Sequence, residues 1–561
     1  MPGDGPGHPV PGCKSRPAGE DVAGVGCRDP LGKSLIDPRL GSVASMSPVA
    51  SRLRSAFPIG PGLLLLCVAC VVMGGLLAPA LGAGALALDE HVSYWMLDSE
   101  HPGTVQSRCL EYGAVPPLGS WLQAASVRLF GKSEWALRLP SLVAAWLSLV
   151  VVFITARHLP PSNADDGTLR GGVAACLLAC HPDLLDEVRI GRCYGLVLLV
   201  ATLVLLATLR WREKLCSFPR SLAWTLSASA LIWTHYTAAL LVAVSWSFLA
   251  VAVVYSGIRS KAGRNLAISS LLLGILCLPL WPAVVRLREW GPFLNMLAPE
   301  ASVWQTISSF WWLGLPLGGL AALVAGALLV RNSRPAGPKW MERDWLLLGC
   351  SLFPLGVIAF IAVDDLSSLA NPRYRVAYAP AGALWMAQWL TRTGSWKPAV
   401  IGLLVALGAA WSVQPLRPWQ LGRLGSPADT SWRELSELIA TQGQPGEPIF
   451  VQSGLVESSL VPGYFTDPVF MEYVACRVSK FYLPAAYPRQ GLPYFWDEAT
   501  LRHFENDLRS QSPPALWIAC ATDTDLNRGS LTGMQQLVEK LGYRIGSQVN
   551  WPHATLLRMT Q

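Results

Sequence analysis

The hydrophobic residues of this chain are gathered in long blocks. The first block runs from Leu63 to Leu88, and similar blocks follow one another up to about residue 413. A helix of about 20 residues crosses a hydrocarbon core of about 30 Å, and most of these blocks are close to that length. The pattern therefore predicts an α-helical polytopic membrane protein.

We expect about 11 transmembrane helices. They correspond to residues 63–88, 136–156, 171–185, 194–209, 221–234, 236–256, 265–285, 309–330, 344–363, 375–391 and 398–413. The first block is too long for the core of a signal peptide and further spans follow it, so we expect an uncleaved first helix. The stretch 221–256 also admits a different division around Thr234-His235-Tyr236. Between the first two spans, Pro117 to Phe130 has the pattern of an amphipathic helix at the membrane interface.

The two ends of the chain differ from its middle. Residues 1–55 are rich in Gly, Pro and Ser and lack periodicity, which predicts disorder, and Met46 offers an alternative start. Residues 414–561 regain charge, and helical patterns alternate there with short apolar runs such as PIFVQS and ALWIACA, which is typical of a small α/β domain. We therefore expect a disordered extension, a membrane domain over 56–413 whose first extracytoplasmic loop is 89–135, and a C-terminal α/β domain over 414–561.

Charge is scarce and unevenly placed. The 561 residues are 52% hydrophobic and 14% charged, against about a quarter charged in a typical soluble protein. The Lys and Arg residues behind the net charge of +7 lie mostly in short loops between apolar blocks, which is a topology signal and not a nucleic-acid footprint. With the N-terminus inside, the inside loops hold more basic residues, and an odd number of spans places 414–561 outside. We expect a bacterial inner membrane.

The 13 cysteines do not form a framework. Those inside apolar blocks, including the Cys67-x-x-Cys70 pair, are expected to serve as small hydrophobic side chains. Cys476 and Cys520 would be able to pair if the C-terminal domain lies outside the cytoplasm, a question that the sequence leaves open.

Polar clusters recur at positions that this topology places on one face of the membrane. They are Asp89-Glu90 with Tyr94; Glu111-Tyr112 with the Pro116-Pro117 turn; Glu187, Arg189, Arg192 and Tyr194; Thr234-His235-Tyr236; and Asn371 to Arg375 after Asp364-Asp365. Arginine forks bind phosphate with parallel hydrogen bonds, and a nearby carboxylate can take a proton from an acceptor hydroxyl. The clusters therefore predict transfer of a charged, lipid-held group at the outer membrane surface.

Each cluster also admits a structural interpretation. The two acids can cap an interfacial helix, and Arg192 and Tyr194 can be interfacial anchors. His235 can be a satisfied histidine between helices. Salt bridges in loops can account for the remaining charges: Glu187, Arg189, Arg373, Arg375, Asp364 and Asp365.

Five stretches carry a resemblance to a known family. They are LDEHVSYW, KSEWALRLPSLVAAWLSLVVVFITARHL, DEVRIGRCYGLVLL, THYTAALL and NPRYRVAYAPAG. In this order they resemble motifs of the GT-C superfamily of membrane glycosyltransferases, in the branch of protein O-mannosyltransferase-like and aminoarabinose-transferase-like enzymes. The resemblance runs from about Leu63 to Trp411.

The resemblance implies an inverting transfer from a polyprenyl-phosphate sugar to a glycan, lipid or protein acceptor at the extracytoplasmic face. By position, Asp89 and Glu90 would be the catalytic residues, with Asp89 as the base and Glu90 as a neighbour that positions substrate or polarises the site. The substrate-binding residues would be Tyr94, Glu187, Arg189, Arg192, Tyr194, His235, Tyr236, Arg373, Tyr374 and Arg375. The acids would also be able to hold a divalent cation (Mg²⁺ or Mn²⁺), although no ligand spacing demands one. No nucleic-acid partner is expected.

The sequence departs from the family pattern in two places. The segment AVPPL has Val115 where the family often has a histidine or lysine, and the inserted Gly191 leaves both Arg189 and Arg192 as phosphate ligands to choose from. Two other functions stay open: a transporter or flippase of lipid-linked sugars, which predicts charges near the middle of the membrane and internal repeats, and a non-catalytic membrane scaffold. The sugar, the acceptor and the oligomeric state stay open as well.

Overall fold

The computed structural model describes residues 60–82, 84–97, 102–159, 166–294, 342–364, 369, 371–391, 400, 427–484 and 486–561. All of them belong to one compact unit, residues 59–561. The expected disordered extension 1–55 and the expected spans 309–330 and 398–413 lie outside the described residues, except for residue 400.

Long apolar helices make up most of the described chain before residue 400. They are α2 (Pro61–Leu77), α6 (Glu134–Arg157), α7 (Asp166–Ala179), α9 (Tyr194–Glu213), α10 (Phe218–Ile232), α11 (Ala239–Ser256), α12 (Lys261–Cys277), α13 (Trp281–Leu294), α16 (Glu342–Asp364) and α17 (Ala379–Thr391). Six segments of the described chain are long and apolar enough to cross a membrane. The chain is therefore an integral, multi-pass membrane protein, while the count of about 11 spans stays a prediction.

Two boundaries differ from the prediction. The expected span 171–185 is wrong, because α7 ends at Ala179 and a separate helix, α8 (Pro182–Arg189), follows. Pro182 lacks an N–H and keeps the preceding His181 extended, at φ −74° and ψ 113°. The first span also ends early, since α2 continues only into η1 (Ala78–Leu81) before Gly82 turns extended.

The connection after the first span is mostly helical. LDEHVSYW lies in α3 (Leu88–Leu97), and the amphipathic helix expected from Pro117 to Phe130 is confirmed as α5 (Leu118–Phe130). Between them lie α4 (Pro102–Ser107) and the π-helical turn η2 (Arg108–Tyr112). The polar motif thus starts a helix of its own and does not trail from the membrane span.

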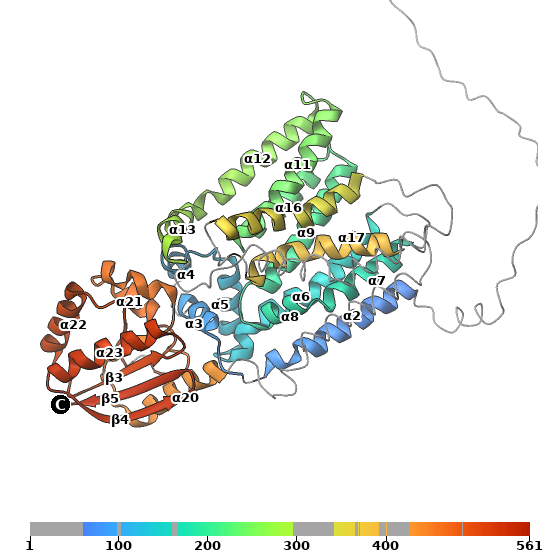
Figure 1. The fold of residues 1–561 in the computed structure, drawn as a ribbon. Coiled ribbons are helices and arrows are strands. Elements are labelled where there is room, and N and C mark those ends of the chain that lie inside the picture. Colours follow the sequence, from blue (N-terminus) through green and yellow to red (C-terminus); the bar gives the residue numbers. More distant parts are fainter. Residues whose placement is uncertain are drawn as a thin grey trace, which may run out of the picture. The chain divides into compact units, whose positions relative to one another are not determined.

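The membrane helices pack closely around α6, α7 and α9. Figure 1 shows α2, α6 and α7 lying along one another, and α6 also packs against α9. Glycine permits the tightest approach: a Cβ on Gly195 would fall 1.9 Å from the carbonyl oxygen of Ser141. Small residues at helix contacts favour packing inside a membrane, where burial of apolar surface gives no drive between helices.

The C-terminal domain contains a five-stranded sheet, as the α/β pattern predicted (Figure 1). Its elements are α20 (Pro427–Gln442), β1 (Ile449–Gln452), η7 (Val456–Gly463), α21 (Pro468–Val474), β2 (Arg489–Gly491), α22 (Glu498–Gln511), β3 (Ala515–Ala521), α23 (Asp525–Lys540), β4 (Arg544–Trp551) and β5 (Ala554–Thr560). The strand order is β2-β1-β3-β5-β4, with β2, β1 and β3 parallel and β5 antiparallel to both of its neighbours. In register, Val451 lies opposite Ala519, and Ile518 opposite Leu557.

The sheet is buried on both faces at its central strand, β3. Along β3, Leu516, Ile518 and Cys520 belong to one apolar core, and the alternate residues Trp517 and Ala519 belong to another. The first core continues without a break into the membrane domain, where it includes residues of α3 and α13. Cys476 and Cys520 are free thiols.

Polar contacts also tie the C-terminal domain to the membrane domain. The Leu86 N–H donates to the Tyr482 hydroxyl at 2.9 Å, and the Tyr112 hydroxyl donates to Asp467 Oδ2 at 3.1 Å. Arg286 Nη1 on α13 donates to the Tyr464 hydroxyl at 2.7 Å. These contacts bring η7 and α21 against the same region that holds the Asp-Glu motif.

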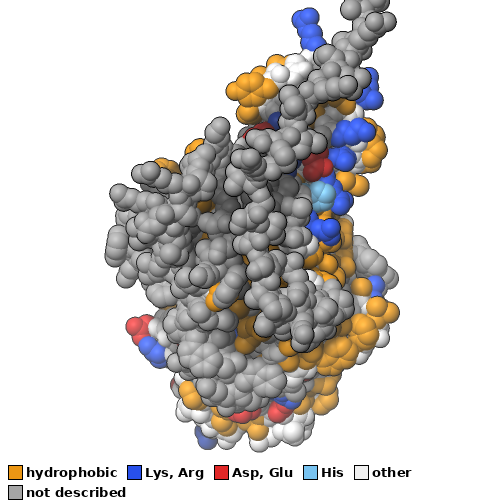
Figure 2. All heavy atoms as spheres, turned by 90° about the vertical axis from the view of Figure 1, so that its right-hand side faces the viewer, with side chains coloured by type: hydrophobic (Ala, Val, Ile, Leu, Met, Phe, Trp, Pro, Cys, Tyr) orange, Lys and Arg blue, Asp and Glu red, His pale blue; other side chains and the backbone are white. Residues whose placement is uncertain are grey.

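Charged side chains join the C-terminal end of α9 to the N-terminal ends of α10 and α16. Arg212 forms two hydrogen bonds with Glu342, at 2.7 and 2.9 Å, and Arg220 pairs with Glu213 at 3.1 Å. Figure 2 shows Lys and Arg side chains gathered along one edge of the face that it presents. The predicted topology assigns these helix ends to the cytoplasmic side, and that orientation stays a prediction.

Candidate active site

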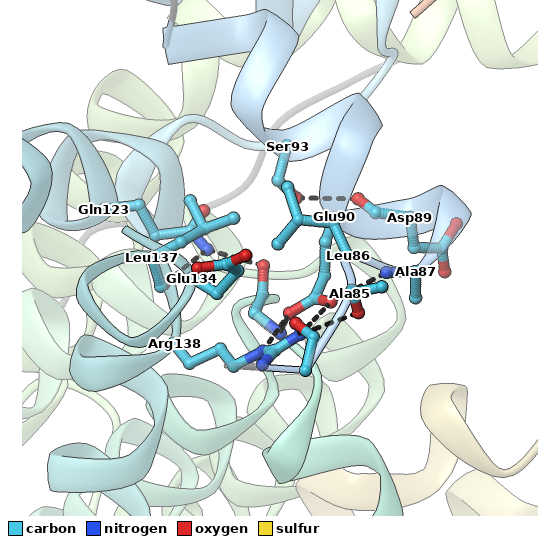
Figure 3. Close-up of polar contacts among 12 residues, drawn as sticks. Ala85, Leu86, Ala87, Asp89, Glu90, Ser93, Gln123, Glu134, Leu137 and Arg138 are labelled. Carbon is cyan, nitrogen blue, oxygen red and sulfur yellow. Dashed lines mark hydrogen bonds and ion pairs between the residues drawn. The ribbon is translucent and has the colours of Figure 1, made fainter. Parts of the chain in front are cut away.

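The start of α3 presents two adjacent carboxylates in different directions. Asp89 and Glu90 lie in its first turn, where the unpaired N–H groups and the helix dipole favour negative charge. Figure 3 shows Glu90 directed toward Arg138 and Asp89 directed away from it. The side chain of Asp89 is 34% exposed and that of Glu90 only 2%. Neighbouring acids of one motif thus face two different environments.

Glu90 is held in a closed network with Arg138 of α6 (Figure 3). Arg138 donates from Nε to Oε1 at 2.7 Å and from Nη2 to Oε2 at 2.8 Å. The N–H of Ala87 donates to Oε2, and that of Gly191 to Oε1. This fork ties the start of α3 to α6 and to the loop after α8, so Glu90 positions the site and does not line it.

The two candidate phosphate ligands, Arg189 and Arg192, lie on opposite sides of Gly191 in the chain and make different contacts. A Cβ on Gly191 would fall 2.7 Å from Glu90 Oε1, so a larger residue would break the network. The next residue in the chain, Arg192, has its Nη1 3.3 Å from the backbone oxygen of Asp89. Arg189 instead donates to the carbonyl of Leu76, at 2.8 Å from Nη2, and pairs with Asp186 at 3.2 Å. Arg192 lines the cavity described next, and Arg189 does not.

A cavity of about 450 Å³ opens beside Asp89. Its wall includes most of the predicted binding residues: Asp89, Arg192, Tyr194, His235, Tyr236, Arg373 and Tyr374. Val115 and Pro116 also line it, which places the variant AVPPL segment at the site. The clusters expected from the sequence to converge therefore lie around one space.

Asp89 lies near two arginines within this cavity, Arg192 and Arg373. Arg373 Nη1 donates to Asp89 Oδ2 at 2.8 Å. Burial acts to raise the pKa of the Asp89 carboxyl, but the charges of Arg192 and Arg373 outweigh it and hold the pKa below its ordinary value. Asp89 is therefore ionised near neutral pH, beside two groups that bind phosphate well.

Glu187 on α8 is a second carboxyl in the same electrostatic field. Burial raises its pKa to about 7, the charges of Asp89 and Asp186 add to the rise, and those of Arg373 and Arg192 oppose it. Its side chain does not line the cavity. A carboxyl that titrates near neutrality thus lies outside the cavity wall but within the field of the ionised Asp89 and its two arginines.

The Thr234-His235-Tyr236 segment forms an aromatic wall. His235 is extended between α10 and η3 (Tyr236–Ala238), which confirms the division of 221–256 at this point. Its ring lies 5.7 Å from that of Tyr194 and 5.7 Å from that of Tyr374. Burial, and then the charges of Arg192 and Arg373, lower the pKa of His235 to about 3, so the imidazole is neutral. A neutral ring between two tyrosines suits packing against a substrate more than binding a charge.

Besides Glu90, Glu187 and Arg189, two more predicted residues lie away from the cavity wall. Tyr94 packs edge-on against Phe481 of the C-terminal domain, with ring centroids 5.0 Å apart. Arg375 is 3% exposed within the η6 segment (Pro372–Tyr378). Neither side chain lines the cavity.

Sequence reasoning missed four residues of this region. Arg138 stands in the quoted KSEWALRLP stretch, but its position inside a predicted span hid its ion pair. Glu457, Tyr473 and Trp290 line the cavity from η7, α21 and α13. No local signal marks them, because tertiary packing alone brings these elements to Asp89. Among the residues that the structure describes, no group of three or more His, Cys, Asp or Glu side chains is placed to hold a metal ion.

Comparisons with known proteins agree with this architecture. Residues 114–217 match the family model described as dolichyl-phosphate-mannose-protein mannosyltransferase. The crystal structure of ArnT from Cupriavidus metallidurans bound to undecaprenyl phosphate matches 88% of this chain and 97% of its own, with 14% sequence identity and a TM-score of 0.55. The apo structure of the same protein matches over the same shares, with 15% identity and a TM-score of 0.53. A comparison with curated proteins finds no match. The expected fold, a helical membrane domain followed by a small α/β domain, is thereby confirmed as the fold of these crystal structures.

Proposed function

We propose that this chain is an inverting glycosyltransferase that moves a sugar from a polyprenyl-phosphate carrier to a glycan, lipid or protein acceptor. The observation that carries the proposal is the ionised Asp89 near Arg192 and Arg373 in a cavity of about 450 Å³. The likeness in fold to a protein crystallised with undecaprenyl phosphate supports the carrier class. The match to a mannosyltransferase family model supports sugar transfer.

In this mechanism, Asp89 takes the proton of the acceptor nucleophile. The nucleophile forms a bond to C1 of the sugar while the bond from C1 to the phosphate oxygen breaks, which inverts C1. The polyprenyl phosphate leaves with the electron pair, and Arg192 and Arg373 stabilise its growing charge. A phosphate that engages Arg373 also removes an ion partner of Asp89, so the donor raises the basicity of the carboxylate.

The other cavity residues have supporting roles. Tyr194, His235, Tyr236 and Tyr374 form a wall for the sugar. Glu90, Arg189, Tyr94 and Arg375 hold the surrounding elements in place. Glu187, whose pKa lies near neutrality, is the second candidate for proton transfer.

The membrane arrangement is part of the proposal. The site would open on the extracytoplasmic face of a bacterial inner membrane, with the C-terminal domain over 414–561 outside. A requirement for Mg²⁺ or Mn²⁺ is tested by comparing transfer after EDTA treatment with transfer after each cation is restored.

The test uses purified protein in lipid nanodiscs and a panel of radiolabelled polyprenyl-phosphate sugars. Wild type is compared with Asp89→Asn and with Asp525→Asn, a control acid whose side chain is 97% exposed. We expect transfer to membrane glycans by the wild type and the control, and turnover about 10²- to 10⁴-fold slower by Asp89→Asn although the donor still binds. Undiminished transfer by Asp89→Asn would move the base to Glu187. Movement of lipid-linked sugar across the bilayer without transfer would instead favour a flippase.

A further inference from the structure

The cavity extends beyond the predicted motifs to a wall built by the C-terminal domain. β1 ends at Gln452, whose Oε1 accepts from the Gly454 N–H at 3.1 Å and from the Ser458 hydroxyl at 2.9 Å. Gly454, at φ +81°, turns the chain into η7, and Glu457 follows in the first turn of η7. The segment that carries Glu457 is therefore fixed by its own hydrogen bonds and presents a carboxylate to the cavity.

Glu457 has one described side-chain partner. The Tyr473 hydroxyl donates to its Oε1 at 2.9 Å, and the Tyr473 ring is in turn packed against Trp95 of α3 at 5.0 Å. Within the described part of the chain, no other side chain donates to this carboxylate. Apart from Tyr473, the only described group that donates to the carboxylate is its own backbone N–H, so the carboxylate still has room to accept from a ligand in the cavity.

Trp290 on α13 supplies an unmatched donor in the same place. Its side chain lines the cavity and is only 4% exposed, and its Nε1 has no hydrogen-bond partner among the described residues. It belongs to the same apolar core as Leu455 and Tyr473, and α13 packs against η7. Buried N–H groups are nearly always paired in folded proteins, so an unpaired one in a cavity wall points to a ligand.

The combination of these groups selects a ligand chemistry. A hydroxyl group both donates and accepts, so a ring with several hydroxyls satisfies the Glu457 carboxylate and the Trp290 N–H together. A phosphate would be repelled by Glu457, and an ammonium group would leave the Trp290 N–H without an acceptor. The two aromatic side chains add apolar faces for the carbons of such a ring.

We infer that Glu457, Tyr473 and Trp290 form a subsite for the hydroxyl groups of a sugar ring, at the end of the cavity built by the C-terminal domain. The inference rests on the proposed glycosyl transfer and adds the part of the site that recognises the sugar. The ring belongs to the donor or to the acceptor, and the binding test separates the two.

The test measures binding to the full-length chain in nanodiscs with three probes. The first is a polyprenyl-phosphate sugar from the panel, the second is polyprenyl phosphate without sugar, and the third is an alkyl glycoside without phosphate. The variants are Glu457→Gln and Trp290→Phe. Their matched controls are Glu505→Gln on α22 and Trp246→Phe. The Nε1 of Trp246 donates a hydrogen bond to Ser270 outside the cavity.

We expect each site variant to bind a glycosylated probe about tenfold more weakly, the loss that follows from one hydrogen bond to a charged or buried partner. Binding of polyprenyl phosphate stays unchanged, which also shows that the variants fold. Weakening with the polyprenyl-phosphate sugar assigns the ring to the donor, and weakening with the alkyl glycoside alone assigns it to the acceptor.

The inference is overturned if both variants bind every glycosylated probe as the wild type does, or if all three probes weaken alike. It is also overturned if the wild type binds neither glycosylated probe. Failure of the proposed function is a separate result: Arg192→Ala and Arg373→Ala would then leave the binding of polyprenyl phosphate unchanged.

Discussion

Two ion pairs begin at adjacent residues of α3 and have opposite characters. Glu90 and Arg138 are 2% and 1% exposed, and Arg138 donates two hydrogen bonds to Glu90. Asp89 and Arg373 are 34% and 27% exposed and share one. A pair sealed from water and matched at both oxygens stabilises one arrangement, whereas a half-open pair can exchange partners with a substrate. Burial, and not residue type, divides the structural acid from the one that we propose as the base.

The largest expected effect is on turnover at the open pair. Asp89→Asn should lower kcat by about 10²- to 10⁴-fold, the usual contribution of a general base. The thermal midpoint of unfolding should stay within a few degrees of wild type, because the side chain is partly solvated. Single-turnover transfer and thermal unfolding, measured on the same preparation, check both halves. A large loss of stability would mean that Asp89 belongs to the scaffold.

The sealed pair should show the reverse profile. Glu90→Gln leaves the buried Arg138 without its counter-charge and should lower the free energy of unfolding by about 3–5 kcal/mol. Denaturant unfolding of the variant in mild detergent measures it. The double variant Glu90→Gln with Arg138→Met removes the stranded charge and should regain part of the loss. If the double variant is no more stable than the single one, the charge of Arg138 is not the cause.

Gly191 links the two pairs and gives a smaller effect. Gly191→Ala places a Cβ 2.7 Å from Glu90 Oε1, and crowding of this kind costs about 1–3 kcal/mol. It should also weaken binding of polyprenyl phosphate by moving Arg192. Gly529→Ala is the matched control, since a Cβ there meets nothing within 4 Å. Equal stability and equal polyprenyl phosphate binding of the two variants would show that Gly191 does not position Arg192.

The smallest expected effect is the pH dependence contributed by Glu187. Its pKa rises from an ordinary value of about 4.5 to about 7 in the folded chain. The folded state therefore holds this proton more tightly than the unfolded state, so the contribution is complete below pH 4.5 and is lost as the pH rises toward 7. Unfolding midpoints across this range should fall less steeply for Glu187→Gln than for the wild type. An unchanged slope would show that Glu187 is not the titrating group.

The comparison also shows where prediction from the sequence succeeded. The motifs around Asp89, Arg192, His235 and Arg373 predicted a shared site, and these side chains line one cavity. The α/β character of residues 427–561 was evident from buried strands such as β3, whose seven residues are all buried. Only the runs of β1 and β3 were predicted, and β2, β4 and β5 were missed. β4 is an edge strand whose residues are all exposed or half-buried and give no apolar run.

The chain's own pattern determined the membrane character, the order of the motifs and the residue types available for chemistry, because hydrophobic length and local charge are properties of contiguous residues. Tertiary structure alone decided three further points: that Glu90 is sealed by Arg138, that Arg192 rather than Arg189 reaches the cavity, and that Glu457 closes it from the C-terminal domain. Each depends on a contact between residues at least 48 positions apart, or on which side of a turn a side chain leaves the backbone. Such relations are set by packing, which no local pattern encodes.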